Sequence, residues 1–215
     1  NPHIVRFLTS LVAGIPEDKL RVIAPEVGGG FGSKIATYPG EFLAVHASRK
    51  LGRPVKWIET RRENYQATTH GRDHVQDVEL AATSDGQILG IRCTVWAGMG
   101  AYLSTAAPGI PTLLHGLMLC GPYKVPAVKE DVYGMYTNTA PVEAYRGAGR
   151  PEAKFMLERM LAMLSDKVKI DPAEIRRRNL IPAFDNGVNV VTGLTYDSGN
   201  YPAALEKALT HIKYD

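Results

Sequence analysis

Residues 75–95 read VQDVELAATSDGQILGIRCTV, and this stretch decides the β-sheet part of the fold. Apolar residues alternate with polar or small ones on both sides of the turn sequence Ser84-Asp85-Gly86-Gln87. Because successive side chains of a strand point to opposite faces, this period of two predicts a long β-hairpin with one buried face. A similar pattern predicts another strand over residues 128–136.

Helices and shorter strands are predicted before this hairpin. Asn1-Pro2 is a typical helix start, and Gly14 followed by Pro16 is a typical helix end. The predicted order then continues with a strand at 20–24, a glycine-rich loop at 28–34, a helix at 41–51 and a strand at 55–58.

The region after the hairpin is predicted to be mostly helical. A helix near 113–119 precedes the strand at 128–136, and Pro151 begins a helix with one apolar face. Asp171-Pro172-Ala173-Glu174 resembles a capping box that opens a short basic helix, and residues 201–212 form the last helix. We therefore expect an α/β (α+β) fold, a two-layer mixed sheet with packed helices, built from segments 1–70, 71–150 and 151–215.

Composition excludes several classes of protein. The 215 residues are 45% hydrophobic and 22% charged, which suits a globular chain with a real core. A formal net charge of +3, with only the short run Arg176-Arg177-Arg178, gives no support for nucleic-acid binding. No apolar run is long enough to span a bilayer. Because the two cysteines lack any CxxC partner, we expect no disulfide framework or zinc site, and a reducing cytoplasm.

The loop Gly28-Gly29-Gly30-Phe31-Gly32-Ser33-Lys34 invites a nucleotide-binding interpretation, but its spacing does not fit. The Walker pattern requires glycine at Ser33 and a hydroxyl residue at Ile35, and the dinucleotide fingerprint loses its last glycine at Ser33. Consecutive glycines still let backbone N–H groups approach an anionic or oxo-bearing ligand, with Phe31 as an apolar wall. A tight turn packed beneath a helix is the alternative.

A second loop, Tyr145-Arg146-Gly147-Ala148-Gly149, places an arginine among small residues. The planar guanidinium suits phosphate, carboxylate or an oxo group. An ion pair between Arg146 and Glu143 or Glu152 is the structural alternative.

Other residues with chemical potential have structural interpretations. His70 and His74 have the spacing of a helical metal pair, but Gly71 and the following strand pattern predict surface histidines instead. Trp57 and Trp96 are expected in strands, as core or sheet-face residues. Cys120 lies before a Gly-Pro turn, and we expect it to be a buried free thiol.

Four motifs together resemble, in order and spacing, the large subunit of the xanthine dehydrogenase, aldehyde oxidase and carbon monoxide dehydrogenase family of molybdenum hydroxylases. The motifs are VGGGFGSK at 27–34, ETR at 59–61, TTHGR at 68–72 and AYRGAGR at 144–150. The resemblance covers nearly the whole chain.

The resemblance implies that the two loops face a molybdenum ion held by the dithiolene of a pyranopterin, either molybdopterin or its cytosine dinucleotide, with no protein ligand to the metal. Arg146 is the catalytic residue it implies within this chain. The cofactor-binding residues it implies are Gly29, Gly30, Phe31, Gly32, Tyr145, Arg146, Gly147 and Ala148. It also implies an iron–sulfur (2Fe-2S) subunit and an FAD subunit as partners, in a dimer of heterotrimers.

Departures from the family pattern narrow the substrate class. Carbon monoxide dehydrogenases carry a copper-binding cysteine at the position of Gly147, and purine-oxidising members carry a glutamate and an arginine at the positions matching Ile35 and Leu114. A xanthine would leave polar groups unpaired at a cost of about 1–3 kcal/mol each. We therefore expect hydroxylation of aldehydes or N-heteroaromatics, with water as the oxygen source.

The resemblance places the family's metal-facing glutamine and its general-base glutamate outside residues 1–215. We therefore expect the 215-residue chain alone to be inactive, because a missing general base costs about two to four orders of magnitude in rate. Three alternatives stay open at this point: a carbon monoxide dehydrogenase large chain, a non-catalytic module that binds another anion, and a structural fragment whose loops bind nothing alone.

Overall fold

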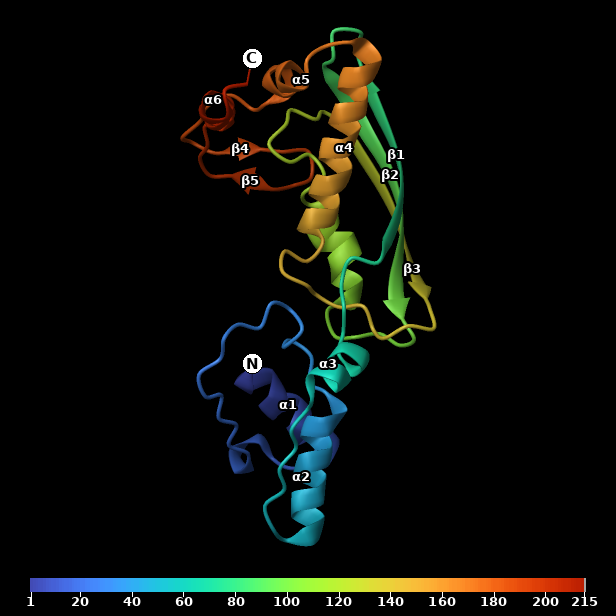
Figure 1. The fold of residues 1–215 in the computed structure, drawn as a ribbon, viewed down its shortest axis with the longest axis vertical. Helices are drawn as coiled ribbons and strands as arrows, with labels where there is room; N and C mark the ends of the chain where they lie inside the picture. Colours follow the sequence, from blue (N-terminus) through green and yellow to red (C-terminus); the bar gives the residue numbers. More distant parts are fainter. Residues whose placement is uncertain (215) are drawn as a thin grey trace. The chain divides into compact units, whose positions relative to one another are not determined.

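A computed structural model describes residues 1–214, which form two compact units. The first unit contains residues 1–73, 98–108 and 136–148, and the second contains 74–97, 109–135 and 149 onward. Figure 1 shows the elements of each unit along the chain. No helix in the described part of the chain is long and apolar enough to cross a bilayer.

The second unit is built on a mixed three-stranded sheet. Strand β1 (His74–Ala82) and strand β2 (Ile88–Gly100) make the predicted antiparallel hairpin, and β3 (Val128–Tyr136) lies on the other side of β2. The Ile91 N–H donates to the Ala127 carbonyl at 2.9 Å, and Trp96 stacks on Tyr133 farther along both strands. In both pairs, the residue number rises along β2 and along β3 together. The two strands are therefore parallel, and the predicted mixed sheet is confirmed.

Helix α4 (Arg150–Val168) packs against β1 through the predicted apolar face. Leu157 and Leu161 are fully buried, and they join Ile88 and Ile91 of β2 in the main core cluster. An apolar residue every three or four positions keeps one stripe of the helix on the sheet, so the sequence period sets the packing.

Two further helices and a small hairpin complete this unit. They are α5 (Pro172–Asn179), β4 (Val188–Asn189), β5 (Thr195–Tyr196) and α6 (Tyr201–Ile212). The Asp171 carboxylate caps α5 by accepting from the N–H groups of Ala173 and Glu174 at 2.8 and 3.0 Å. The capping box is only half formed, because the Glu174 carboxylate binds Arg177 and Arg178 instead. Strands β4 and β5 were not predicted, because a strand of two residues is too short to show an alternating pattern.

The helix predicted near 113–119 is displaced. A π-helical turn covers Ile110–Leu114, and only a short helical stretch and turns follow it. Gly149 packs directly on this turn, where an added Cβ would lie 2.8 Å from the His115 nitrogen. Gly116 lies against the Glu130 carboxylate with no room for a side chain. These close approaches between distant segments override the local helical pattern.

The first unit contains helices α1 (Pro2–Ala13), α2 (Pro39–Leu51) and α3 (Arg61–Ala67), with α1 in contact with α2. Gly14 and Gly52 end α1 and α2 in the left-handed conformation, as the sequence predicts. Helix α3 was not predicted. Its capping box is visible in the sequence, since the Thr60 hydroxyl accepts from the Glu63 N–H while the Glu63 carboxylate accepts from the Thr60 N–H.

The strands predicted at 20–24 and 55–58 are wrong. Both segments lack strand pairing in the described structure, and Ile23 and Ile58 are each 68% exposed. An extended, apolar segment becomes a strand only when a neighbour accepts and donates its ladder hydrogen bonds, and the described residues provide no such neighbour here.

Candidate functional site

The glycine loop at 28–34 has a backbone that only glycine can adopt at two positions. Gly29 and Gly32 have φ of 118° and 101°, and a Cβ on Gly32 would collide with the Ala144 carbonyl. Phe31 also has a positive φ, 49°, and its ring is 52% exposed. The loop therefore approaches the segment before Arg146 closely while it presents the Phe31 ring outward.

In the middle of this loop the backbone carbonyls accept hydrogen bonds, whereas the backbone N–H groups donate none to any described residue. The carbonyls of Gly30, Phe31 and Gly32 accept from Lys34, Arg146 and Ile35 at 3.3, 2.9 and 2.9 Å. In the part of the chain that the structure describes, no acceptor takes the N–H groups of Gly30, Phe31 and Gly32. Three consecutive unpaired backbone donors, two of which, Phe31 and Gly32, have positive φ, are suited to an anionic or oxo-bearing ligand.

The arginine loop lies directly against the glycine loop. The Arg146 N–H donates to the Phe31 carbonyl, and the Arg146 guanidinium lies 5.5 Å from the centroid of the Phe31 ring. Gly147 and Ala148 have φ of 99° and 38°, and the Ala148 N–H closes the turn on the Tyr145 carbonyl at 2.6 Å. The first unit thus brings all eight predicted site residues together, although their contact with a cofactor stays a prediction.

Two residues that sequence reasoning did not assign support the arginine loop. The Arg72 guanidinium donates to the Arg146 carbonyl at 2.5 Å and lies 4.9 Å from the centroid of the Tyr145 ring. Gly71 leaves the space for Tyr145, since an added Cβ would lie 2.7 Å from the Tyr145 Cβ. Both residues belong to the TTHGR motif at 68–72. That motif contributes to the family resemblance, but the resemblance assigns no role to either residue.

Glu143 is buried and does not form the alternative ion pair with Arg146. It is 1% exposed, and its carboxylate accepts from the backbone N–H groups of Ala106 and Ala144 at 3.1 and 3.0 Å. The Thr105 hydroxyl is a third donor at 3.4 Å. The Arg146 guanidinium lies instead over the Phe31 ring, 5.5 Å from its centroid.

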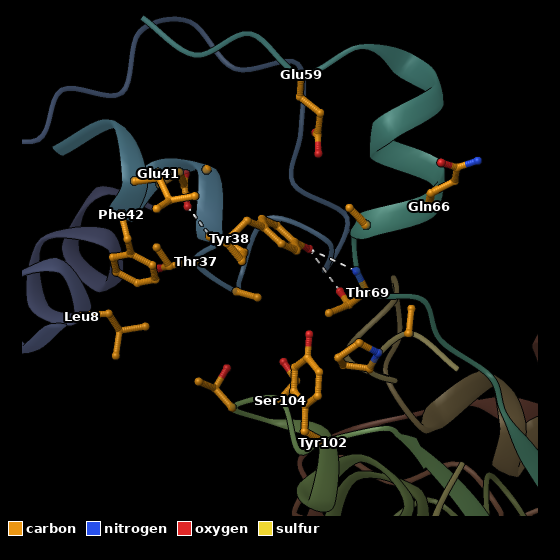
Figure 2. Close-up of a pocket in the computed structure, with 18 of the residues that line it drawn as sticks. Leu8, Thr37, Tyr38, Glu41, Phe42, Glu59, Gln66, Thr69, Tyr102 and Ser104 are labelled. Atoms are coloured by element: carbon orange, nitrogen blue, oxygen red, sulfur yellow. Dashed lines mark hydrogen bonds between the residues drawn. The ribbon is translucent and has the colours of Figure 1, made fainter. Parts of the chain in front are cut away.

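A cavity of about 850 Å³ lies beside the start of α2 in the first unit. Figure 2 shows the Tyr38 hydroxyl reaching Thr69, with Phe42 and Tyr102 among the aromatic walls. The hydroxyl of Thr37 is buried and has no hydrogen-bond partner among the described residues. None of the eight predicted site residues lines this cavity.

The remaining candidates behave as structural residues. His70 is exposed and forms a bridge to Val142, and His74 begins β1, so the two do not share a helix. Trp96 lies in β2 as expected, whereas Trp57 lies outside any strand and is 56% exposed. Cys120 is a buried free thiol, as predicted. Residues 1–214 contain no cluster of three or more His, Cys, Asp or Glu side chains that could hold a metal ion.

The family model described as "Molybdopterin cofactor-binding domain" matches residues 1–180. Among known proteins, the carbon monoxide dehydrogenase large chain of Hydrogenophaga pseudoflava is 45% identical over 99% of this chain and 27% of its own length. The chain thus spans about a quarter of the length of this relative.

Solved structures agree with this match. Carbon monoxide dehydrogenase from Oligotropha carboxidovorans is 41% identical with a TM-score of 0.92, and quinoline 2-oxidoreductase from Pseudomonas putida 86 is 33% identical with a TM-score of 0.92. Each likeness covers 99% of this chain and 27% of the solved chain.

Proposed function

Because this chain belongs to the molybdopterin cofactor-binding domain family, we propose that it forms part of the cofactor site of a molybdenum hydroxylase large subunit. The observation that carries the proposal is the row of unpaired N–H donors at Gly30, Phe31 and Gly32, next to the Arg146 guanidinium. These groups fit a ligand that carries oxo or other anionic oxygens.

Each part of the site has a proposed role. The cofactor-binding residues are Gly29, Gly30, Phe31, Gly32, Tyr145, Arg146, Gly147 and Ala148. The bound molybdenum–pyranopterin supplies the two-electron oxidation and the oxygen transfer from water. The backbone donors would orient that group, the exposed Phe31 ring would exclude water from one side, and the Arg146 guanidinium, which lies over that ring, would be a charged donor to it.

The proposed substrates are aldehydes or N-heteroaromatics. Ile35 offers no hydrogen bond to a purine, and its side chain is 37% exposed. Gly147 stands where the resemblance puts the copper-binding cysteine, and its φ of 99° is a conformation that a cysteine rarely adopts. The competing proposal, carbon monoxide oxidation, is favoured by the 45% identity to a carbon monoxide dehydrogenase large chain.

The whole enzyme would need other chains. We propose that electrons leave through an iron–sulfur subunit to an FAD subunit, in a cytoplasmic dimer of heterotrimers. The chain spans 27% of the carbon monoxide dehydrogenase large chain, so these assignments concern the full-length protein.

The test is metal and pterin analysis of the full-length large chain, purified with its neighbouring subunits and compared with an established molybdenum enzyme produced in the same cells. Oxidation of a panel of aldehydes, N-heterocycles and carbon monoxide is measured on the same sample. Molybdenum with a pterin and turnover of an aldehyde or N-heterocycle is the expected result. Absence of both molybdenum and pterin, while the reference enzyme loads normally, would reduce the two loops to structural turns.

A further inference from the structure

The Glu143 carboxylate is the most deeply buried acid in the first unit, at 1% exposure. It accepts from the Ala106 N–H, the Thr105 hydroxyl and the Ala144 N–H, and all three donors are neutral. Burying an ionised carboxylate is costly unless hydrogen bonds replace the lost water. These three donors offset that cost, and they come from two separate segments of the chain.

The main chain of the same residue reaches a third segment. The Glu143 N–H donates to the His70 carbonyl at 2.7 Å, and the His70 N–H donates to the Pro141 carbonyl at 3.3 Å. The side chain and the main chain of Glu143 therefore connect residues 105–106, 144 and 70. Arg72, two residues beyond His70, then supports the Arg146 carbonyl.

This arrangement leads directly to the contact between the two loops. One carboxylate oxygen fixes the N–H of Ala144, and the carbonyl of that residue lies where a Cβ on Gly32 would be. Two residues later, the Arg146 N–H binds the Phe31 carbonyl. A shift of the Ala144 peptide would therefore move both points at which the arginine loop meets the glycine loop.

We propose that Glu143 is a positioning residue of the site, whose buried carboxylate sets the place of Arg146 relative to the Phe31–Gly32 peptide. It acts through Ala144 and does not touch the substrate. The consequence for catalysis rests on the proposed function, whereas the coupling between the two loops does not. Loss of the carboxylate should loosen the arginine loop and leave the rest of the first unit folded.

The substitution Glu143→Gln tests this with almost no change of volume. Both carboxylate oxygens accept from N–H groups, so an amide must point its own NH₂ at one of these donors. The hydrogen bond to that backbone N–H, of Ala106 or of Ala144, is therefore lost. Thr105→Val removes only the longest of the three bonds, and Glu79→Gln is the matched control, because Glu79 is exposed and paired with Arg92 on the sheet.

The first readout is hydrogen–deuterium exchange of backbone amides in the full-length complex. Glu143→Gln should accelerate exchange at Ala144 and Ala106, its direct partners, and also at Arg146, by about tenfold or more. Glu79→Gln should change none of them. Faster exchange at Ala144 and Ala106 with Arg146 unchanged would overturn the proposal, because the carboxylate would then stabilise only its own surroundings.

The second readout is kinetic. With the molybdenum content maintained, Glu143→Gln should lower kcat by about tenfold or more and change KM by less than about twofold, because a displaced Arg146 weakens a contact made in the transition state. Glu143→Asp should recover part of kcat, and Thr105→Val should stay within about twofold of the unmodified enzyme. Unchanged kcat in a Glu143→Gln enzyme that holds molybdenum would overturn the positioning role alone, whereas an unmodified complex without molybdenum and pterin would overturn the proposed function.

Discussion

The backbone N–H of Arg146 donates a hydrogen bond to the carbonyl oxygen of Phe31 at 2.9 Å. The same two residues meet again through their side chains, since the Arg146 guanidinium lies 5.5 Å from the centroid of the Phe31 ring. The main-chain bond fixes where the arginine loop meets the glycine loop, and the side-chain contact holds the charged group over an exposed aromatic face.

Replacing Arg146 by alanine should lower turnover of the full-length enzyme by about two to three orders of magnitude, the usual effect of removing one preorganised donor. The Arg146 side chain is exposed, so the melting temperature should change little. Steady-state kinetics, normalised to molybdenum content, measure the effect. Arg92→Ala, at an exposed arginine on the sheet, is the control, and equal activity of both variants would contradict the role of Arg146.

Replacing Gly32 by alanine should prevent stable cofactor loading. The φ of 101° costs an L-residue about 1–2 kcal/mol, and the new methyl group would also collide with the Ala144 carbonyl. Molybdenum and pterin content should fall to about a tenth or less. Gly28→Ala is the matched control in the same loop, because an added Cβ there meets nothing within 4 Å, and it should load normally.

Replacing Gly147 by cysteine should not create a carbon monoxide oxidase. Its φ of 99° would strain a cysteine by about 1–2 kcal/mol, so the thiol would not be held in a fixed position over the site. Copper analysis and carbon monoxide oxidation after incubation with Cu(I) measure the outcome. Carbon monoxide turnover that depends on copper would show that this loop accepts the copper-dependent chemistry.

The thiol of Cys93 should resist alkylation in the folded protein. Burial, reinforced by the carboxylates of Glu130 and Asp77, raises the pKa of Cys93 from 9.0 to about 12. Because the folded state holds this proton more tightly, its contribution to stability is complete below about pH 9 and is lost as the pH rises towards 12.

Mass spectrometry after iodoacetamide treatment at pH 9 measures this reactivity. Cys93 should stay unmodified in buffer and react fully in urea. The melting temperature of Cys93→Ala should also fall less steeply above pH 9 than that of the unmodified protein. Rapid modification of the native protein would show that Cys93 is accessible.

The sequence predicted the second unit better than the first for a physical reason. The hairpin of β1 and β2 and the buried stripe of α4 are local patterns, whose residues alone determine which face is buried. The segments at 20–24 and 55–58 carry the same apolar signal, but a strand also needs a partner, which no local pattern can specify.

The candidate site was also predictable only in part from the sequence. The two loops could be found because glycines and an arginine in a fixed order are visible in the sequence, and their meeting in one unit follows the resemblance. The support from Glu143 and Arg72 could not be found, because it depends on the burial of one side chain and the reach of another across the fold.

The chain's two tryptophans are divided between its units, which gives each unit its own optical probe. Trp57 is 56% exposed in the first unit, where its indole lies against Gly40, and Trp96 stacks on Tyr133 in the second. Acrylamide should therefore quench the emission of Trp57 more strongly than that of Trp96. Two single-tryptophan variants would then show, from fluorescence alone, whether the first unit unfolds together with the sheet of the second or before it.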